Sequence, residues 1–151
     1  MKTVLFACVH NAGRSQMAAA LFNKFADPAK AHAISAGTQP GGHVHPEVVV
    51  VMREVGIDLA GVVPRRLADD LAAGVNMLVT MGCGEACPVV TGAERADWPL
   101  DDPKGKPIEQ VRQIRDEVEG RVRQLVEERG WLRSSAPPSA PKWSTTRTST
   151  R

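Results

Sequence analysis

The chain has 151 residues, of which 42% are hydrophobic, and its formal net charge at pH 7 is +2. This length suffices for one domain with a hydrophobic core, while the small charge and the lack of a basic stripe argue against a nucleic-acid partner. No segment approaches the ~20 apolar residues of a membrane span. We expect a cytoplasmic protein with no membrane partner, in which three cysteines favour catalysis, redox exchange or metal binding over a disulfide framework.

Strand-like and helix-like patterns alternate along the chain. Short apolar runs predict strands at residues 4–7, 31–37 and 76–82, with a weaker one at 96–100. Helical spacing predicts helices that begin near residues 15, 46, 65 and 108. This alternation indicates an α/β domain: a small, doubly wound parallel sheet of about four strands, covered by helices on both faces. We assign residues 1–132 to this domain and residues 133–151, rich in Ser, Thr, Pro and Arg, to a disordered tail.

Three of the predicted helices end at glycines. Pro46 suits a first helical position and Gly56 the cap beyond that helix, and Gly74 ends the short helix that begins at residue 65. The last helix keeps one apolar face and is closed by Gly130. On its polar side, Glu117 with Arg121 and Glu119 with Arg123 have the i,i+4 spacing of stabilising ion pairs.

A tight loop separates the first strand from the first helix and begins with Cys8. It leaves the sheet at the carboxyl edge, where ligands of parallel sheets bind, and successive N–H groups at a helix N-terminus can converge on an anion. Arg14 can hold two oxygens of an oxyanion, and the same positive field favours the thiolate of Cys8, to which the Ser15 hydroxyl can donate. The residues expected to bind the oxyanion are Val9, His10, Asn11, Ala12, Gly13, Arg14 and Ser15.

The stretch "CVHNAGRS" resembles the Cys-x5-Arg-Ser loop of the low-molecular-weight tyrosine phosphatases and of the arsenate reductases that share their fold. The resemblance continues through "RSQMA", "ISAGT", "VHPEVVVVMREVGID" and "WPLDDP", over roughly residues 3 to 130. It implies that Cys8 is the nucleophile and that Asn11 holds the shape of the loop. It also implies that Asp102, directly before Pro103, is the general acid, with Asp101 as the second candidate.

Two features favour the reductase branch of this family. The tyrosine phosphatases usually carry aromatic residues beside the acid, whereas this chain has no tyrosine and continues with Lys104 and Gly105. A pocket without aromatic walls suits a small oxyanion, so we expect arsenate as substrate, with phosphate or sulfate as competitors. The second feature is a pair of thiols, Cys83 and Cys87, which follow the third strand and therefore emerge at the same sheet edge as Cys8.

The resemblance to thioredoxin-coupled arsenate reductases implies a disulfide relay. In this relay Cys83 attacks the sulfur of Cys8, arsenite leaves, and Cys87 then forms the exchangeable disulfide with Cys83. No bound cofactor is expected, because an external thiol reductant would regenerate the enzyme: thioredoxin, mycothiol or another low-molecular-weight thiol.

Three alternatives remain open at this point. The chain could be a phosphatase that hydrolyses phosphate monoesters, or a non-enzymatic module that binds oxyanions. Cys83 and Cys87 with His43 and His45 could also form a zinc site, although this cysteine spacing is uncommon for zinc and we do not expect a metal. The monovalent-cation site of some family members is not expected, since the first helix carries no carboxylate.

Overall fold

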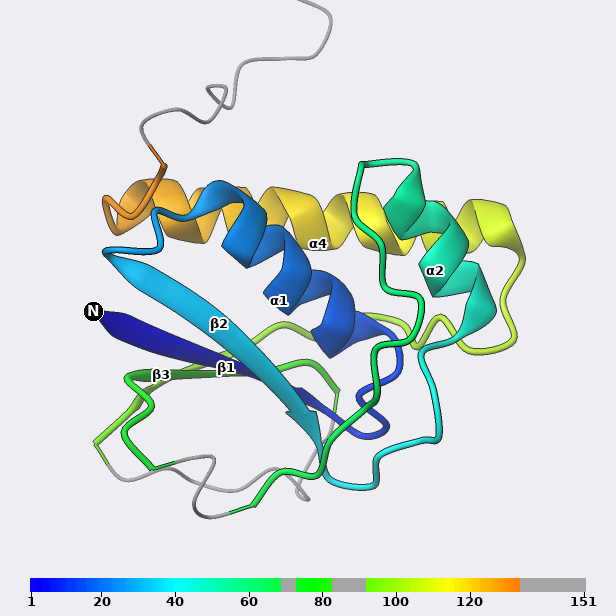
Figure 1. The fold of residues 1–151 in the computed structure, drawn as a ribbon, viewed down its shortest axis with the longest axis horizontal. Helices are drawn as coiled ribbons and strands as arrows, with labels where there is room; N and C mark the ends of the chain where they lie inside the picture. Colours follow the sequence, from blue (N-terminus) through cyan, green and yellow to red (C-terminus); the bar gives the residue numbers. More distant parts are fainter. Residues whose placement is uncertain (69–72, 83–91, 134–151) are drawn as a thin grey trace, which may run out of the picture.

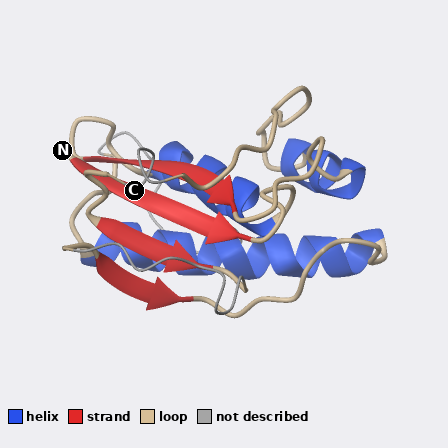
Figure 2. Cartoon of the chain, turned by 90° about the horizontal axis from the view of Figure 1, so that it is seen from below, coloured by secondary structure: helices blue, strands red, loops and turns tan. Residues whose placement is uncertain are grey.

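The computed structural model describes residues 1–68, 73–82 and 92–133. Within them the chain forms one four-stranded sheet in which every neighbouring pair of strands is parallel, in the order β2–β1–β3–β4. The strands are β1 (Lys2–Cys8), β2 (Ala31–Gly37), β3 (Met77–Thr80) and β4 (Glu94–Asp97). Figure 2 shows the four arrows pointing the same way, so the carboxyl ends of the strands share one edge of the sheet.

The described helices are α1 (Arg14–Phe25), α2 (Pro46–Arg53) and α4 (Ile108–Glu128), and all three lie on one face of the sheet (Figures 1 and 2). Their buried side chains form the main core together with Phe6 of β1, whose ring contacts the rings of Phe22 and Trp98. The opposite face carries a smaller apolar cluster around Leu5 and Leu78. The predicted fold class is therefore confirmed, with the described helices on one face rather than on both.

Two predicted elements differ from the structure. The fourth strand covers residues 94–97 rather than 96–100, because backbone pairing with β3 begins at Glu94 while Trp98 turns into the core. The helix predicted from residue 65 is wrong over residues 65–68, where the backbone extends the edge of β2. There the Gly37 N–H donates to the Arg65 carbonyl and the Leu67 N–H donates to the Gly37 carbonyl. Residues 69–72, the centre of that predicted helix, lie outside the described part.

The last helix follows its prediction closely. It spans Ile108–Glu128, both expected ion pairs form, and Gly130 adopts the left-handed conformation that ends it. The chain then returns to the end of α1, where the Arg133 N–H donates to the Phe25 carbonyl. Residues 134–151, nearly all of the predicted tail, lie outside the described residues. None of the described helices is both long and apolar enough to cross a membrane.

Candidate active site

The loop between β1 and α1 has all of its carbonyl groups occupied. The carbonyls of residues 8, 9, 10 and 12 accept bonds of 2.7–3.2 Å from the backbone N–H groups of residues 38, 39, 41 and 45. The Asn11 carbonyl accepts from Gln16 Nε2, and the Gly13 carbonyl accepts from the Met17 N–H within the first turn of α1. By contrast, no N–H from residue 9 to residue 15 donates to another described residue. The loop therefore presents a row of donors suited to an anion.

A buried side-chain network under this loop determines which atom faces the Cys8 sulfur. The Arg65 N–H donates to Asn11 Oδ1, which fixes the orientation of the amide, so Asn11 Nδ2 donates to Ser15 Oγ at 2.7 Å. The Ser15 hydroxyl keeps its own proton, which it can donate to Cys8 Sγ, 2.9 Å away. Cys8 itself is buried, with 2% of its surface exposed.

Arg14 is held on the opposite side of the loop. Its Nη1 donates to the Leu100 carbonyl at 3.0 Å, and its Nη2 lies 3.8 Å from Asp102 Oδ2. Gly82 lies directly against the guanidinium: a Cβ atom on this residue would be 2.3 Å from Arg14 Nη1, and its φ of +99° also favours glycine. Gly82 and the Leu100 carbonyl meet Arg14 only through the fold, so no local sequence pattern predicts either contact.

The segment Asp102–Pro103 packs against the loop between β1 and α1. Asp102 accepts the Lys104 N–H on Oδ1 and turns Oδ2 toward Arg14. A Cβ atom on Gly13 would lie 2.6 Å from Pro103 Cγ, so a larger residue there would push Pro103 off the loop. Asp101 is exposed and has no bond to the loop among the described residues. The structure thus brings Asp102 rather than Asp101 to Arg14, and the catalytic role of Asp102 stays a prediction.

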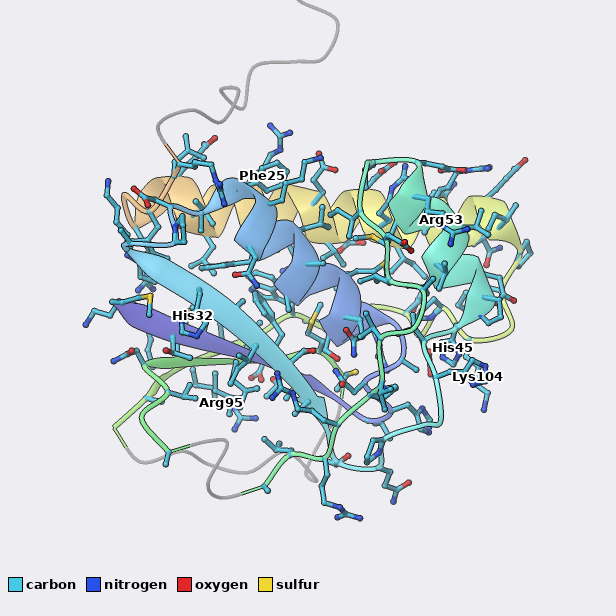
Figure 3. All side chains as sticks on the ribbon, in the orientation of Figure 1. Phe25, His32, His45, Arg53, Arg95 and Lys104 are labelled. Carbon is cyan, nitrogen blue, oxygen red and sulfur yellow. The ribbon has the colours of Figure 1, made fainter. Side chains whose placement is uncertain are left out.

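His45, the residue directly before α2, forms a hydrogen bond with the loop. Its N–H donates to the Ala12 carbonyl at 2.9 Å. Burial of the imidazole lowers its pKa below the ordinary value, and the nearby carboxylates of Asp102 and Glu47 oppose this shift only in part. Figure 3 shows the His45 and Lys104 side chains close together at the start of α2. From the sequence, His45 was considered only as a possible zinc ligand, because its contact with the loop arises only in the fold.

The two remaining predicted site residues, Cys83 and Cys87, lie outside the described residues. The chain leaving β3 does reach the loop, since Met81 N–H donates to the Ala7 carbonyl and Gly82 lies against Arg14. Among residues 1–68, 73–82 and 92–133, no three His, Cys, Asp or Glu side chains are grouped as ligands of a metal ion.

Comparison with known proteins relates this fold and loop to one family. The sequence model described as "Low molecular weight phosphotyrosine protein phosphatase" matches residues 3–131. A protein of Halobacterium salinarum is 41% identical over 127 residues, covering 82% of this chain and 89% of its own length. An arsenate reductase of Brevibacillus brevis is 35% identical over 130 residues, covering 83% of this chain and 95% of its own length.

Solved structures of proteins with two different activities share this fold. The thioredoxin-dependent arsenate reductase of Corynebacterium glutamicum matches with a TM-score of 0.72 and 36% identity over 85% of this chain, and this chain spans 61% of that protein. The YwlE arginine phosphatase of Geobacillus stearothermophilus matches with a TM-score of 0.76 and 27% identity, covering 86% of this chain and 94% of the phosphatase.

Proposed function

Because the chain belongs to the low molecular weight phosphotyrosine protein phosphatase family, we propose that it acts as an arsenate reductase, converting arsenate to arsenite. The observation that carries the proposal is the loop itself. Its carbonyls are all occupied by other groups, its N–H groups and Arg14 are available to a tetrahedral oxyanion, and the Cys8 sulfur lies at the start of the same loop.

In the first step the loop N–H groups and Arg14 bind arsenate, and the Cys8 thiolate attacks arsenic. An As–S bond forms and an As–O bond breaks, and Asp102 supplies the proton with which that oxygen leaves as water. The position of Asp102 Oδ2 beside Arg14 Nη2 supports this assignment, since both groups then act on the same oxyanion.

In the second step Cys83 attacks the Cys8 sulfur. An S–S bond forms, the As–S bond breaks, and its electron pair remains on arsenic, which leaves as arsenite. Cys87 next attacks Cys83, which releases the Cys8 thiolate and leaves a Cys83–Cys87 disulfide for an external thiol to reduce. The position of Gly82 against Arg14 supports the relay, because Cys83 is the next residue in the chain.

The reductant is proposed to be thioredoxin, with mycothiol as the alternative. The resemblance to the thioredoxin-dependent enzyme of Corynebacterium glutamicum supports the first. The proposal also places the protein in the cytoplasm, where thiols are kept reduced. It assigns the activity to residues 1–132 and no role to the tail of residues 133–151.

A phosphatase activity is the second candidate. The similarity to the YwlE arginine phosphatase favours it, and hydrolysis of a phosphoryl-cysteine would need only Cys8, Arg14 and Asp102. The absence of any tyrosine in the chain, and Lys104 and Gly105 after the acid, favour the smaller oxyanion. The two candidates differ in whether Cys83 and Cys87 are needed.

The test measures arsenite formation by the full chain, once with thioredoxin, its reductase and NADPH and once with a mycothiol-based system. We expect turnover with thioredoxin, no arsenite from Cys83→Ser, and one turnover by Cys87→Ser, which should stop as a Cys8–Cys83 disulfide visible by mass spectrometry. Both variants should keep any hydrolysis of a small aryl phosphate. Wild-type turnover by the Cys83→Ser/Cys87→Ser double variant with thioredoxin would refute the relay, whereas turnover sustained only by mycothiol would move the second thiol to the small molecule.

A further inference from the structure

His45 occupies the point at which three parts of the site meet. Its N–H donates to the Ala12 carbonyl of the loop, and its own carbonyl accepts the N–H groups of Val48 and Val49 in the first turn of α2. A single residue therefore ties the oxyanion loop to the helix that follows it. These backbone hydrogen bonds fix the position of the His45 Cα atom and therefore the point from which the imidazole extends.

The imidazole of His45 lies at the contact between the loop and the segment that carries the predicted acid. A Cβ atom on Gly13 would have Pro103 Cγ at 2.6 Å and His45 Cδ2 at 3.5 Å as neighbours. Gly13, Pro103 and the half-buried imidazole thus pack around one point. The ring and Pro103 thus both border Gly13, and the charges of Asp102 and Lys104, on either side of Pro103, act on the ring.

The charged and titratable groups that act on the imidazole come from three segments of the chain. Asp102 and Lys104 belong to the segment of the predicted acid, Glu47 to α2 and His10 to the loop. Burial outweighs the two carboxylates and lowers the pKa of His45, so the ring is neutral at pH 7 and gains a proton only on acidification.

We propose that His45 is a positioning residue that seats the segment Asp102–Pro103 on the oxyanion loop and does so as a neutral imidazole. The inference rests on the proposed function for its catalytic consequence, since seating matters if Asp102 delivers the proton. Protonation of His45 would change the charge beside Asp102, the residue that delivers the proton in the proposed reaction.

The experiment compares His45→Ala, His45→Gln and the control His43→Ala, which removes an exposed imidazole two residues earlier. We expect His45→Ala to lower kcat for arsenate reduction about tenfold, part of the ~10²–10⁴ that a general acid supplies, while KM for arsenate stays within about threefold because Arg14 remains in place. Glutamine reaches as far as the imidazole but does not titrate. His45→Gln should therefore keep most of kcat and lose the fall in activity at the acid end of a profile between about pH 5 and 8.

A second measurement does not depend on activity. The Lys104 N–H donates to Asp102 Oδ1, so its amide resonance in a ¹H–¹⁵N spectrum of the full chain reports the position of that carboxyl. The resonance should shift in His45→Ala and remain unchanged in His43→Ala.

Three outcomes would overturn the inference: wild-type kcat in His45→Ala, an unchanged acid limb in His45→Gln, or an unmoved Lys104 resonance. If the wild-type chain forms no arsenite while the Lys104 resonance moves, the proposed function fails and the seating role of His45 stands. If His45→Ala does not fold, the pH profile and the Lys104 resonance of His45→Gln are compared with those of wild type instead.

Discussion

Two networks of polar side chains in this molecule differ in how far they are exposed to solvent. Under the loop, the side chains of Asn11, Ser15 and Gln16 are joined by hydrogen bonds, and all three residues are buried. Between α2 and α4, the Glu54 carboxylate accepts bonds from Arg112 and Arg115, and the Glu54 and Arg112 side chains are 35% and 41% exposed. The first network surrounds the nucleophile, and the second joins two helices at the surface.

This difference in exposure indicates which polar contacts should affect both activity and stability and which should affect stability alone. A buried donor or acceptor that loses its partner costs about 1–3 kcal/mol, because no water replaces the partner. An exposed ion pair contributes ~0–1 kcal/mol, because water and salt screen it. Changes at the loop should therefore act strongly on both activity and stability, and changes at the surface network weakly and on stability alone.

The largest effect is expected at the nucleophile. Cys8→Ser should lower arsenate reduction and any aryl phosphate hydrolysis below about one percent of wild type, because the hydroxyl is a far weaker nucleophile than the thiolate. The circular dichroism spectrum and Tm should stay close to wild type, since the two side chains differ by one atom. Arsenite formation above that level would mean that another group attacks arsenic.

The second effect separates Asp102 from its neighbour. Asp102→Asn should slow the chemical step by about 10²–10⁴-fold in single-turnover measurements, because the amide cannot donate the proton that the leaving oxygen needs. Asp101→Asn is the matched control and should stay within about threefold of wild type, since Asp101 is exposed away from Arg14. A larger loss in Asp101→Asn would assign the proton to Asp101.

The third prediction concerns the network under the loop. Asn11→Ala removes the acceptor of the Arg65 N–H and the donor to Ser15, and it puts a Cβ-bearing residue without a polar side chain at a φ of +52°. The free energy of unfolding should fall by about 2–4 kcal/mol, the sum of orphaned buried groups and left-handed strain. Denaturant unfolding measures this loss.

Asn11→Gly separates the two contributions. Glycine accepts the positive φ without strain, so the loss that remains in this variant comes from the missing hydrogen bonds and from the greater freedom of glycine in the unfolded chain. We expect more than half of the loss to remain. Recovery of wild-type stability in Asn11→Gly would mean that backbone strain, and not the network, dominates.

The sequence predicted the parts of this site that depend on local pattern. The apolar run that ends at Cys8, the helical spacing after it and the Arg14–Ser15 pair are contiguous, so the strand, the loop and the helix followed directly. The fourth strand was placed two residues too late because Glu94 and Arg95 lie in an edge strand, where backbone pairing with β3 decides the structure and the side chains give no apolar signal.

Contacts between distant segments could not be predicted in the same way. Gly82 lies against Arg14, and Pro103 lies against Gly13, although 68 and 90 positions separate the members of these pairs. The extended backbone at residues 65–68 has the same origin, since it is set by Gly37 and not by its own helical composition. Sequence pattern therefore predicts which loop carries the nucleophile, whereas the fold decides which residues support it.

The smallest effect is expected at the surface network and depends on pH. Hydrogen bonds from Arg112 and then from Arg115 lower the pKa of Glu54 to about 2, against 4.5 for the free side chain. A carboxyl whose pKa is depressed in the folded state stabilises the fold fully above its unfolded pKa and loses that contribution as pH falls toward the folded pKa.

Glu54→Gln should thus lower Tm by no more than about 4 °C near pH 7 and leave kcat unchanged. The Tm difference from wild type should be constant above about pH 5 and shrink between about pH 4.5 and 2 in thermal unfolding curves. Glu94→Gln, which removes the exposed partner of Arg129 at the other end of α4, is the matched control. A Tm difference for Glu54→Gln that does not change with pH would mean that packing of the side chain, and not its charge, holds α2 against α4.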